Sequence, residues 1–162
     1  MNSREATPRT TADNANGRRW SYDGSAYEGV AAYARAVRHG NYIAVSGTVD
    51  MAEDGTAAHP GDVYRQTLRS FQKSIAAIEE LGGTRHDIIR TRIFLGHGED
   101  WNGAVRAHKE LFEGVDPANT SLFVAGFFVP GVLVEVEVDA IMDSGATAVS
   151  AANPTGTALE GA

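Results

Sequence analysis

The sequence predicts an α+β two-layer sandwich, in which two helices pack on one face of a mostly antiparallel sheet. Two observations lead to this fold class. Short β-branched runs flank two longer segments whose apolar residues recur at helical spacing. The order along the chain is strand, strand, helix, strand, helix, strand, strand. A chain of 162 residues, 43% of them apolar, is long enough to bury one core of this kind.

Two short strands begin the predicted sheet. The runs Tyr33–Arg38 and Tyr42–Thr48 are separated by His39-Gly40-Asn41, which is typical of a hairpin turn. A loop follows over residues 50–60, where Asp54-Gly55 is a turn signal.

Two helices are predicted after this loop. Asp62–Leu81 is the clearer one, with Asp62 as N-cap and Gly82-Gly83 as its stop. The second helix covers Asp100–Glu113, and Pro117 prevents its continuation. Spacings of three and four place the apolar residues of the first helix on one face: Tyr64, Leu68, Phe71, Ile75 and Ile78.

Three further strands are predicted: Ile88–Leu95 between the helices, then Asn119–Phe128 and Val132–Met142, joined by a turn at Pro130-Gly131. Alternation is clean in the last of them. The side chains expected to face the helices are Val132, Val134, Val136, Val138, Ala140 and Met142. Those expected on the opposite face are Leu133, Glu135, Glu137, Asp139 and Ile141. In Ile88–Leu95, the same alternation groups Ile88, Arg90, Arg92 and Phe94.

The charged residues on this second sheet face have two interpretations. They form a solvated surface, or Arg92 pairs with a carboxylate such as Glu137 if the two strands lie in the same sheet. Partly buried pairs of this kind suit a subunit interface or an anion pocket. Because no third layer is predicted to cover this face, we expect the protein to self-associate.

Composition excludes several classes of function. The absence of cysteine excludes disulfides, zinc–thiolate sites and a catalytic thiol. A net charge of −7 argues against nucleic-acid binding. No apolar run reaches the roughly 18–20 residues of a membrane span, and the N-terminal residues do not read as a signal peptide. We expect a cytoplasmic protein with a disordered leader (1–18), one folded domain (19–142) and a flexible tail (143–162).

Other catalytic and metal sites find little support. The histidines at 39, 59, 86, 97 and 108 show no spacing typical of metal ligands, so we expect no metal site. Ser46 and Ser121 lack the His/Asp arrangement of a serine hydrolase. Glu135 and Glu137, two apart on one strand, have a separation near that of an inverting glycosidase, but no sugar-stacking cleft accompanies them.

Ordered blocks of this sequence resemble the RidA/YjgF family. Residues 33–48, ending in Val-Ser-Gly-Thr, resemble that family's N-terminal hairpin. The C-terminal signature of the family is matched by Pro117-Ala-Asn-Thr-Ser121 followed by Val134-Glu-Val-Glu137. Between them lie a helical block ending in Leu-Gly-Gly and the segment Asp87–Leu95, in the family's order. The resemblance covers about residues 30–142.

The resemblance implies a homotrimer of a chorismate-mutase-like fold, with active clefts at the subunit boundaries. It also implies hydrolysis of reactive enamines and imines, such as 2-aminoacrylate, to a keto acid and ammonia, without a cofactor or metal. Glu135 matches the glutamate that positions the attacking water. Tyr33 matches the tyrosine that lines the cleft, and Ser46 and Gly47 match the substrate-binding Ser-Gly turn.

One position departs from the family pattern. Asn119 stands where the family has the arginine that holds the substrate carboxylate, and asparagine has neither the charge nor the fork of a guanidinium. We therefore expect an altered substrate preference. Asn119, Ser121 and Phe123 share one strand face, which suggests a more polar and aromatic pocket. Arg92 is the candidate replacement cation; a structural ion pair with Glu137 or Asp139 is at least as consistent with its position.

The sequence thus predicts a hydrolytic deaminase of small imines or enamines, or of a related conjugated compound. His108 is a candidate proton carrier, although a structural histidine fits its helical position better. Two alternatives stay open: a non-catalytic trimer that binds a metabolite or a partner protein, and a pathway-specific enzyme with a changed reaction in the same cleft. Ribonuclease activity fits the acidic composition least.

Overall fold

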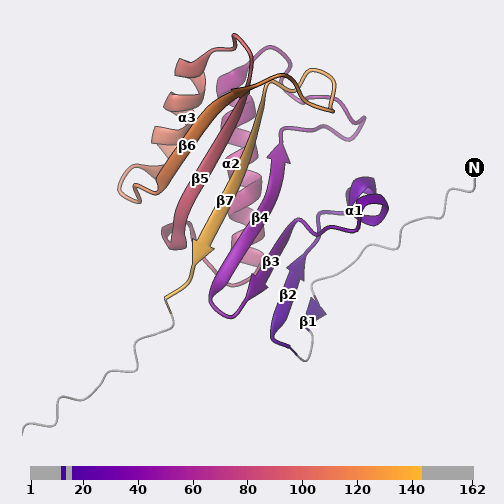
Figure 1. Cartoon of the computed structure of the whole chain (residues 1–162), viewed down its shortest axis with the longest axis vertical. Helices are drawn as coiled ribbons and strands as arrows, with labels where there is room; N and C mark the ends of the chain where they lie inside the picture. Colours follow the sequence, from indigo (N-terminus) through magenta and orange to yellow (C-terminus); the bar gives the residue numbers. More distant parts are fainter. Residues whose placement is uncertain (1–11, 14–15, 144–162) are drawn as a thin grey trace, which may run out of the picture.

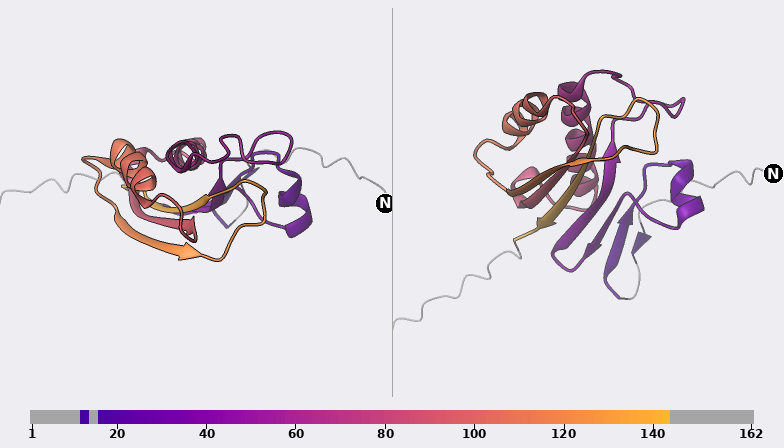
Figure 2. Two further views of the ribbon diagram at one scale, coloured as in Figure 1. Left: turned by 90° about the horizontal axis from the view of Figure 1, so that it is seen from above. Right: turned by 45° about the horizontal axis from the view of Figure 1, so that its top comes forward.

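The computed structural model describes residues 12–13 and 16–143, which form a curved sheet with two long helices on one face (Figures 1 and 2). The sheet order is β1-β2-β3-β4-β7-β5-β6. The strands are β1 (Ala12–Asp13), β2 (Arg18–Ser21), β3 (Ala36–His39), β4 (Tyr42–Val49), β5 (Ile88–Gly96), β6 (Ala118–Val124) and β7 (Val134–Ile141). The helices are α1 (Ala26–Ala31), α2 (Val63–Glu80), a single 3₁₀ turn η1 (Arg85–Asp87) and α3 (Trp101–Phe112).

The predicted fold class is confirmed. Every strand pair is antiparallel except β5 and β6, which run parallel because α3 crosses over between them. The seen-from-above view in Figure 2 places α2 and α3 on the same side of the sheet. None of the described helices is long and apolar enough to cross a membrane.

Three elements near the N-terminus were not expected. β1 and β2 extend the sheet beyond β3, and α1 follows them with Ser25 as its N-cap. Residues 12–13 and Arg18 belong to the expected disordered leader but are strand residues here. Such short strands contain too few residues for a period of two to be recognisable. The remainder of that leader and the tail after residue 143 lie outside the described residues.

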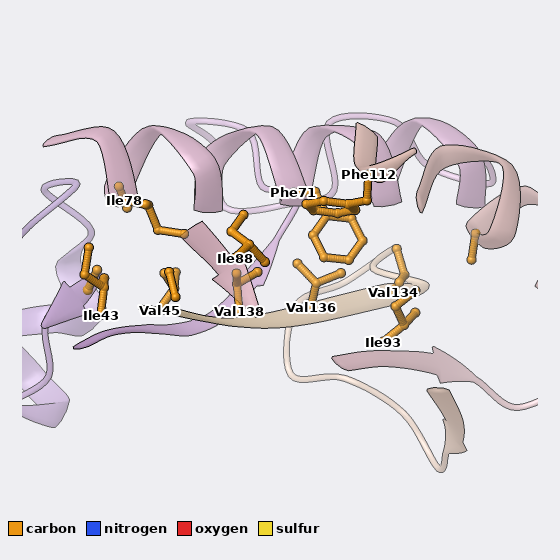
Figure 3. Close-up of a cluster of buried hydrophobic side chains, with 14 of the residues drawn as sticks. Ile43, Val45, Phe71, Ile78, Ile88, Ile93, Phe112, Val134, Val136 and Val138 are labelled. Carbon is orange, nitrogen blue, oxygen red and sulfur yellow. The ribbon is translucent and has the colours of Figure 1, made fainter. Parts of the chain in front are cut away.

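The core lies between the two helices and the sheet, as Figure 3 shows. Asp62 caps α2 as predicted, since its side chain accepts a hydrogen bond from the Arg65 backbone N–H at 2.9 Å. Phe71 of α2 and Phe112 of α3 meet edge to face, with ring centroids 5.0 Å apart. Close packing of these rings holds α3 against α2 and fixes both helices over the sheet.

The predicted alternation holds in β7 and fails at the start of β5. Val134 and the alternate β7 residues up to Ala140 are fully buried under the helices. In β5, a register shift lies between Ile88 and Arg90. Ile88 is therefore buried and Ile89 is 46% exposed, the reverse of the expected order.

The strand predicted for Asn119–Phe128 is shorter than expected. It ends at Val124, and residues 125–131 form a loop that leads to β7. Pro130 and Gly131, whose φ is 77°, close this loop as a turn. Phe127 and Phe128 consequently lie outside the sheet, where they contribute to the site described next.

Candidate functional site

A cavity of about 260 Å³ lies where β4 ends and β7 begins. Its walls come from the segment before α1, from Tyr33, from the last residues of β4, from α2 and from the 125–131 loop. Three residues expected in the site line it together: Tyr33, Gly47 and Glu135.

A β-bulge in β4 brings Gly47 beneath Glu135. Val45 pairs with Val138 and Thr48 pairs with Val136, so Ser46 and Gly47 together oppose a single β7 residue. The bulge lets both Val45 and Thr48 point into the core. A Cβ atom at position 47 would collide with Oε1 of Glu135, so only glycine lets this carboxylate lie against the strand.

The Glu135 carboxyl group is half-buried, and burial raises its pKa above the usual value. The nearby negative charge of Glu137 raises the pKa further, whereas the positive charge of Arg35 lowers it. Arg35 lies below the bulge, where Nη2 donates a 2.6 Å hydrogen bond to the Gly47 carbonyl oxygen. A carboxyl group with a raised pKa, open to a cavity, is suited to accept a proton from water near neutral pH.

Two basic residues of the cavity wall, Arg35 and Lys73, were not predicted from the sequence. Lys73 lies at the margin of the buried face of α2, and its Nζ donates to the Val49 carbonyl oxygen at 3.2 Å. Burial lowers the pKa of Lys73. A lysine beside the buried stripe of an amphipathic helix is weak evidence for a binding site, because most such lysines extend their ammonium group into solvent.

Arg92 lies outside this cavity and forms ion pairs with Glu137 and Asp139, the two partners predicted for it. It pairs with Glu137 across the β5–β7 ladder, and Nη1 lies 3.3 Å from Glu137 Oε2 and 3.1 Å from Asp139 Oδ2. The interpretation of these charges as a purely solvated surface is wrong. With two carboxylates on one guanidinium, the structural ion pair is the role that the geometry supports.

Asn119 and Ser121 also lie apart from the cavity, on the helix side of β6. Ser121 Oγ donates to Asn119 Oδ1 at 2.8 Å, and Asn119 Nδ2 donates to Thr91 Oγ1 at 3.0 Å. Phe123 is 52% exposed on the same edge strand. A single chain therefore does not bring these residues to Glu135.

The Asn119 chain of hydrogen bonds ends at His108. Thr91 Oγ1 lies 2.9 Å from His108 Nε2, and burial lowers the pKa of this imidazole. The Thr91 hydroxyl accepts from Asn119, and it donates to His108 Nε2 or accepts from it according to the imidazole tautomer. The ring also packs on Phe71 and Phe112. This is the environment of a structural histidine.

Ser46 has a backbone partner of its own. Its hydroxyl donates to the Ala34 carbonyl oxygen at 2.8 Å and helps to hold the bulge. Within the described residues, no group of three or more histidines, aspartates and glutamates is arranged to hold a metal ion.

Comparison with known proteins identifies the family. A family model described as endoribonuclease L-PSP matches residues 24–142, most of the chain. The chain belongs to this family, the YjgF/RidA family. The match includes Tyr33, Gly47 and Glu135 of the cavity.

Relatives of this YjgF/RidA chain include proteins named as deaminases. An uncharacterised protein of Streptomyces coelicolor is 43% identical over 117 residues, which is 72% of this chain and 87% of the relative. A protein of Acinetobacter baylyi named 3-aminoacrylate deaminase RutC is 27% identical, over 66% of this chain and 84% of its own. A 2-iminobutanoate/2-iminopropanoate deaminase of Dermatophagoides farinae is 25% identical, over 59% and 75%.

Solved structures of the YjgF/RidA family share the fold. Rv2704 of Mycobacterium tuberculosis, described as a member of the YjgF/YER057c/UK114 family, superposes with a TM-score of 0.70 at 29% identity. The superposition covers 78% of this chain and all of Rv2704. The YjgF gene product of E. coli superposes with a TM-score of 0.58 at 26% identity, over 67% and 87% of the two chains.

Proposed function

We propose that this chain is a hydrolytic deaminase of small imines or enamines, with Glu135 as the residue that activates water. The observation that carries the proposal is the half-buried carboxyl group lying against Gly47 in a cavity that also contains Tyr33. Some relatives are named as deaminases of such compounds, which supports the same reaction class.

The proposed reaction is balanced by one water and one proton shuttle. The Glu135 carboxylate accepts a proton from water while the oxygen bonds to the imine carbon, and the C=N π electrons move to nitrogen. Glu135 then returns the proton to the nitrogen of the carbinolamine. In a second proton transfer, Glu135 accepts the hydroxyl proton of the carbinolamine and passes it to nitrogen. The C=O bond forms as the C–N bond breaks, and a carbonyl compound and ammonia leave. The raised pKa of Glu135 makes its carboxylate a stronger proton acceptor than an exposed one, which supports this role.

We also propose a cytoplasmic homotrimer in which a neighbouring subunit completes the cleft. Asn119, Ser121 and Phe123 lie on an edge strand, where a second copy can meet them. In this assembly Asn119 replaces a charged substrate contact by a neutral one, which supports an altered preference. One observation favours the alternative of a changed reaction or of binding alone. Asn119 is already hydrogen-bonded to Thr91, so this N–H donor is not free to hold a substrate.

The test is ammonia release from imines generated freshly by an amino-acid oxidase across a panel of amino acids. Wild-type protein is compared with Glu135→Ala and Asn119→Arg. We expect acceleration by the wild type and its loss in Glu135→Ala, with the assembly's mass unchanged. Activity that appears only in Asn119→Arg would instead assign the natural chain another reaction or a binding role. RNA cleavage abolished by Glu135→Ala would also overturn the proposal.

A further inference from the structure

The cavity contains two basic side chains, and among the described residues only Arg35 has an ion-pair partner within 4 Å. Burial lowers the pKa of Lys73, and the negative charges of Asp23 and Asp50 act against this shift. Arg35 donates to the Gly47 carbonyl oxygen and lies 3.7 Å from Asp23 Oδ2, with its side chain 9% exposed. Lys73 donates to the Val49 carbonyl oxygen and, within the described residues, forms no ion pair within 4 Å. An ammonium group has three donors, so Lys73 retains hydrogen-bonding capacity at the cavity wall.

The loop after β6 gives the cavity an apolar surface. Phe127, Phe128 and Val129 line the cavity together with Met51 and Tyr27. Phe128 is fully exposed, and Tyr27 is 56% exposed. Aromatic side chains in this state gain stability when an apolar group covers them. The cavity therefore offers an unpaired cation from α2 and an apolar surface from the loop.

The charges around the cavity disfavour an anion with two negative charges. Asp23 and Glu135 line the same space and repel a dianion such as a phosphate monoester. A monoanionic carboxylate can pair with Lys73 and leave its apolar portion against the loop. Arg92, the other candidate cation, is occupied by Glu137 and Asp139.

We propose that the cavity selects small carboxylates with an aromatic or large aliphatic group, holding the carboxylate on Lys73 and the apolar group against Phe127 and Phe128. This inference names the substrate class of the proposed deaminase and rests on that function for its catalytic meaning. The proposed carboxylate contact comes from α2. The inference also distinguishes this chain's substrates from small, weakly apolar imino acids.

Binding of stable compounds tests the inference without relying on turnover. Isothermal titration with 3-phenylpropanoate, its amide and propanoate separates the charge from the apolar group. We expect the aromatic acid to bind about tenfold more tightly than either comparison compound. Equal binding of the acid and the amide, or of the acid and propanoate, would overturn the proposal.

The sequence offers a matched control for Lys73. Its only other lysine is Lys109, which is exposed on α3 beside Glu113. Lys73→Met should abolish the preference for the acid over the amide, whereas Lys73→Arg and Lys109→Met should preserve it. Phe128→Ala should reduce the preference for the phenyl group. Retained acid preference in a folded Lys73→Met protein, verified by its thermal unfolding, would contradict the inference.

A second readout reports on Lys73 directly. Reductive ¹³C-methylation preserves the charge of lysine and yields signals from only two lysine side chains in this sequence. The aromatic acid should shift the Lys73 signal and leave the Lys109 signal in place. A shift of neither signal, or of both equally, would count against a carboxylate on Lys73.

Failure of the inference is distinguishable from failure of the proposed function. Glu135→Gln should lose imine hydrolysis but bind 3-phenylpropanoate at least as tightly, because it removes a nearby negative charge. If the protein does not hydrolyse imines but prefers the acid in a way that depends on Lys73, the proposed deaminase activity is refuted and the proposed carboxylate site is supported. If the protein hydrolyses imines but shows no preference for the acid over the amide, the carboxylate site is refuted and the deaminase activity is supported.

Discussion

Gly47 and Glu135 form the contact on which the site depends. The bulge in β4 adds one residue that has no partner in the ladder. The carboxyl group of Glu135 occupies the space that a side chain at position 47 would fill. Arg35 supports the bulge from beneath through the Gly47 carbonyl oxygen. The position of the proposed general base is therefore set by a glycine and by a backbone contact.

Replacing Gly47 by alanine should displace Glu135 while leaving the core intact. Because the new methyl group would overlap Oε1, the carboxyl group must rotate out of position, and we expect imine hydrolysis to fall about a hundredfold. Steady-state kinetics and thermal unfolding measure the two effects. Gly29→Ala in α1 is the control, since a Cβ there meets no atom within 4 Å. Unchanged kinetics in a folded Gly47→Ala protein would show that the contact has no catalytic importance.

The raised pKa of Glu135 makes its contribution to stability depend on pH. A folded-state pKa above the unfolded value favours folding at low pH, and this contribution is lost as pH rises through the folded pKa. Glu135→Gln should therefore raise the urea midpoint at about pH 7, and this gain should disappear below about pH 4. Equal midpoint differences at both values would contradict a raised pKa.

At the scale of elements, a chain of hydrogen bonds joins α3 to β5 and β6. It runs from His108 through Thr91 to Asn119, and burial lowers the pKa of the imidazole, which favours its neutral form. A depressed histidine pKa contributes stability above the unfolded value of about 6.5, and this contribution is lost as pH falls through the folded pKa.

His108→Gln should remove this part of the pH dependence. Glutamine can hydrogen-bond to Thr91 without titrating, so urea midpoints between about pH 7 and 5 should vary less than in the wild type. His86→Gln, at an exposed position in η1, is the control. If both variants keep the wild-type slope, His108 is not the residue that lowers stability on acidification.

At the scale of the whole molecule, the sheet face opposite α2 and α3 has no covering layer among the described residues (Figure 2). Phe94 and Leu122 are paired on this face, next to the Arg92 ion pairs. Leu122 is 47% exposed. An apolar pair beside partly buried charges is the composition expected of a subunit interface.

Leu122→Asp should disrupt the proposed trimer, because it places a charge in the apolar part of that face. Light scattering should give about three times the 17.2 kDa chain mass for the wild type and a smaller mass for the variant. Val105→Asp is the control, as a similarly exposed apolar residue on α3. A monomeric wild type, or equal masses for wild type and Leu122→Asp, would contradict this interface.

The fold class, both long helices, the alternation of β7 and the family were all predicted correctly from the amino-acid sequence. These features depend on local periodicity and on ordered motifs, which a single chain displays directly. The sequence also placed Arg92 opposite Glu137 as a conditional pair. It did not reveal β1, β2 or α1, whose segments are too short for a periodic signal.

Only the tertiary structure decided which residues share the cavity. Tyr33, Gly47 and Glu135 meet there because a bulge shifts the β4–β7 register by one residue, and alternation alone cannot locate a bulge. Lys73 joins them from α2. Asn119 instead faces the helix layer, where Thr91 links it to His108. Side chains become neighbours through long-range strand pairing and helix docking, so the composition of the site was a property of the packed chain.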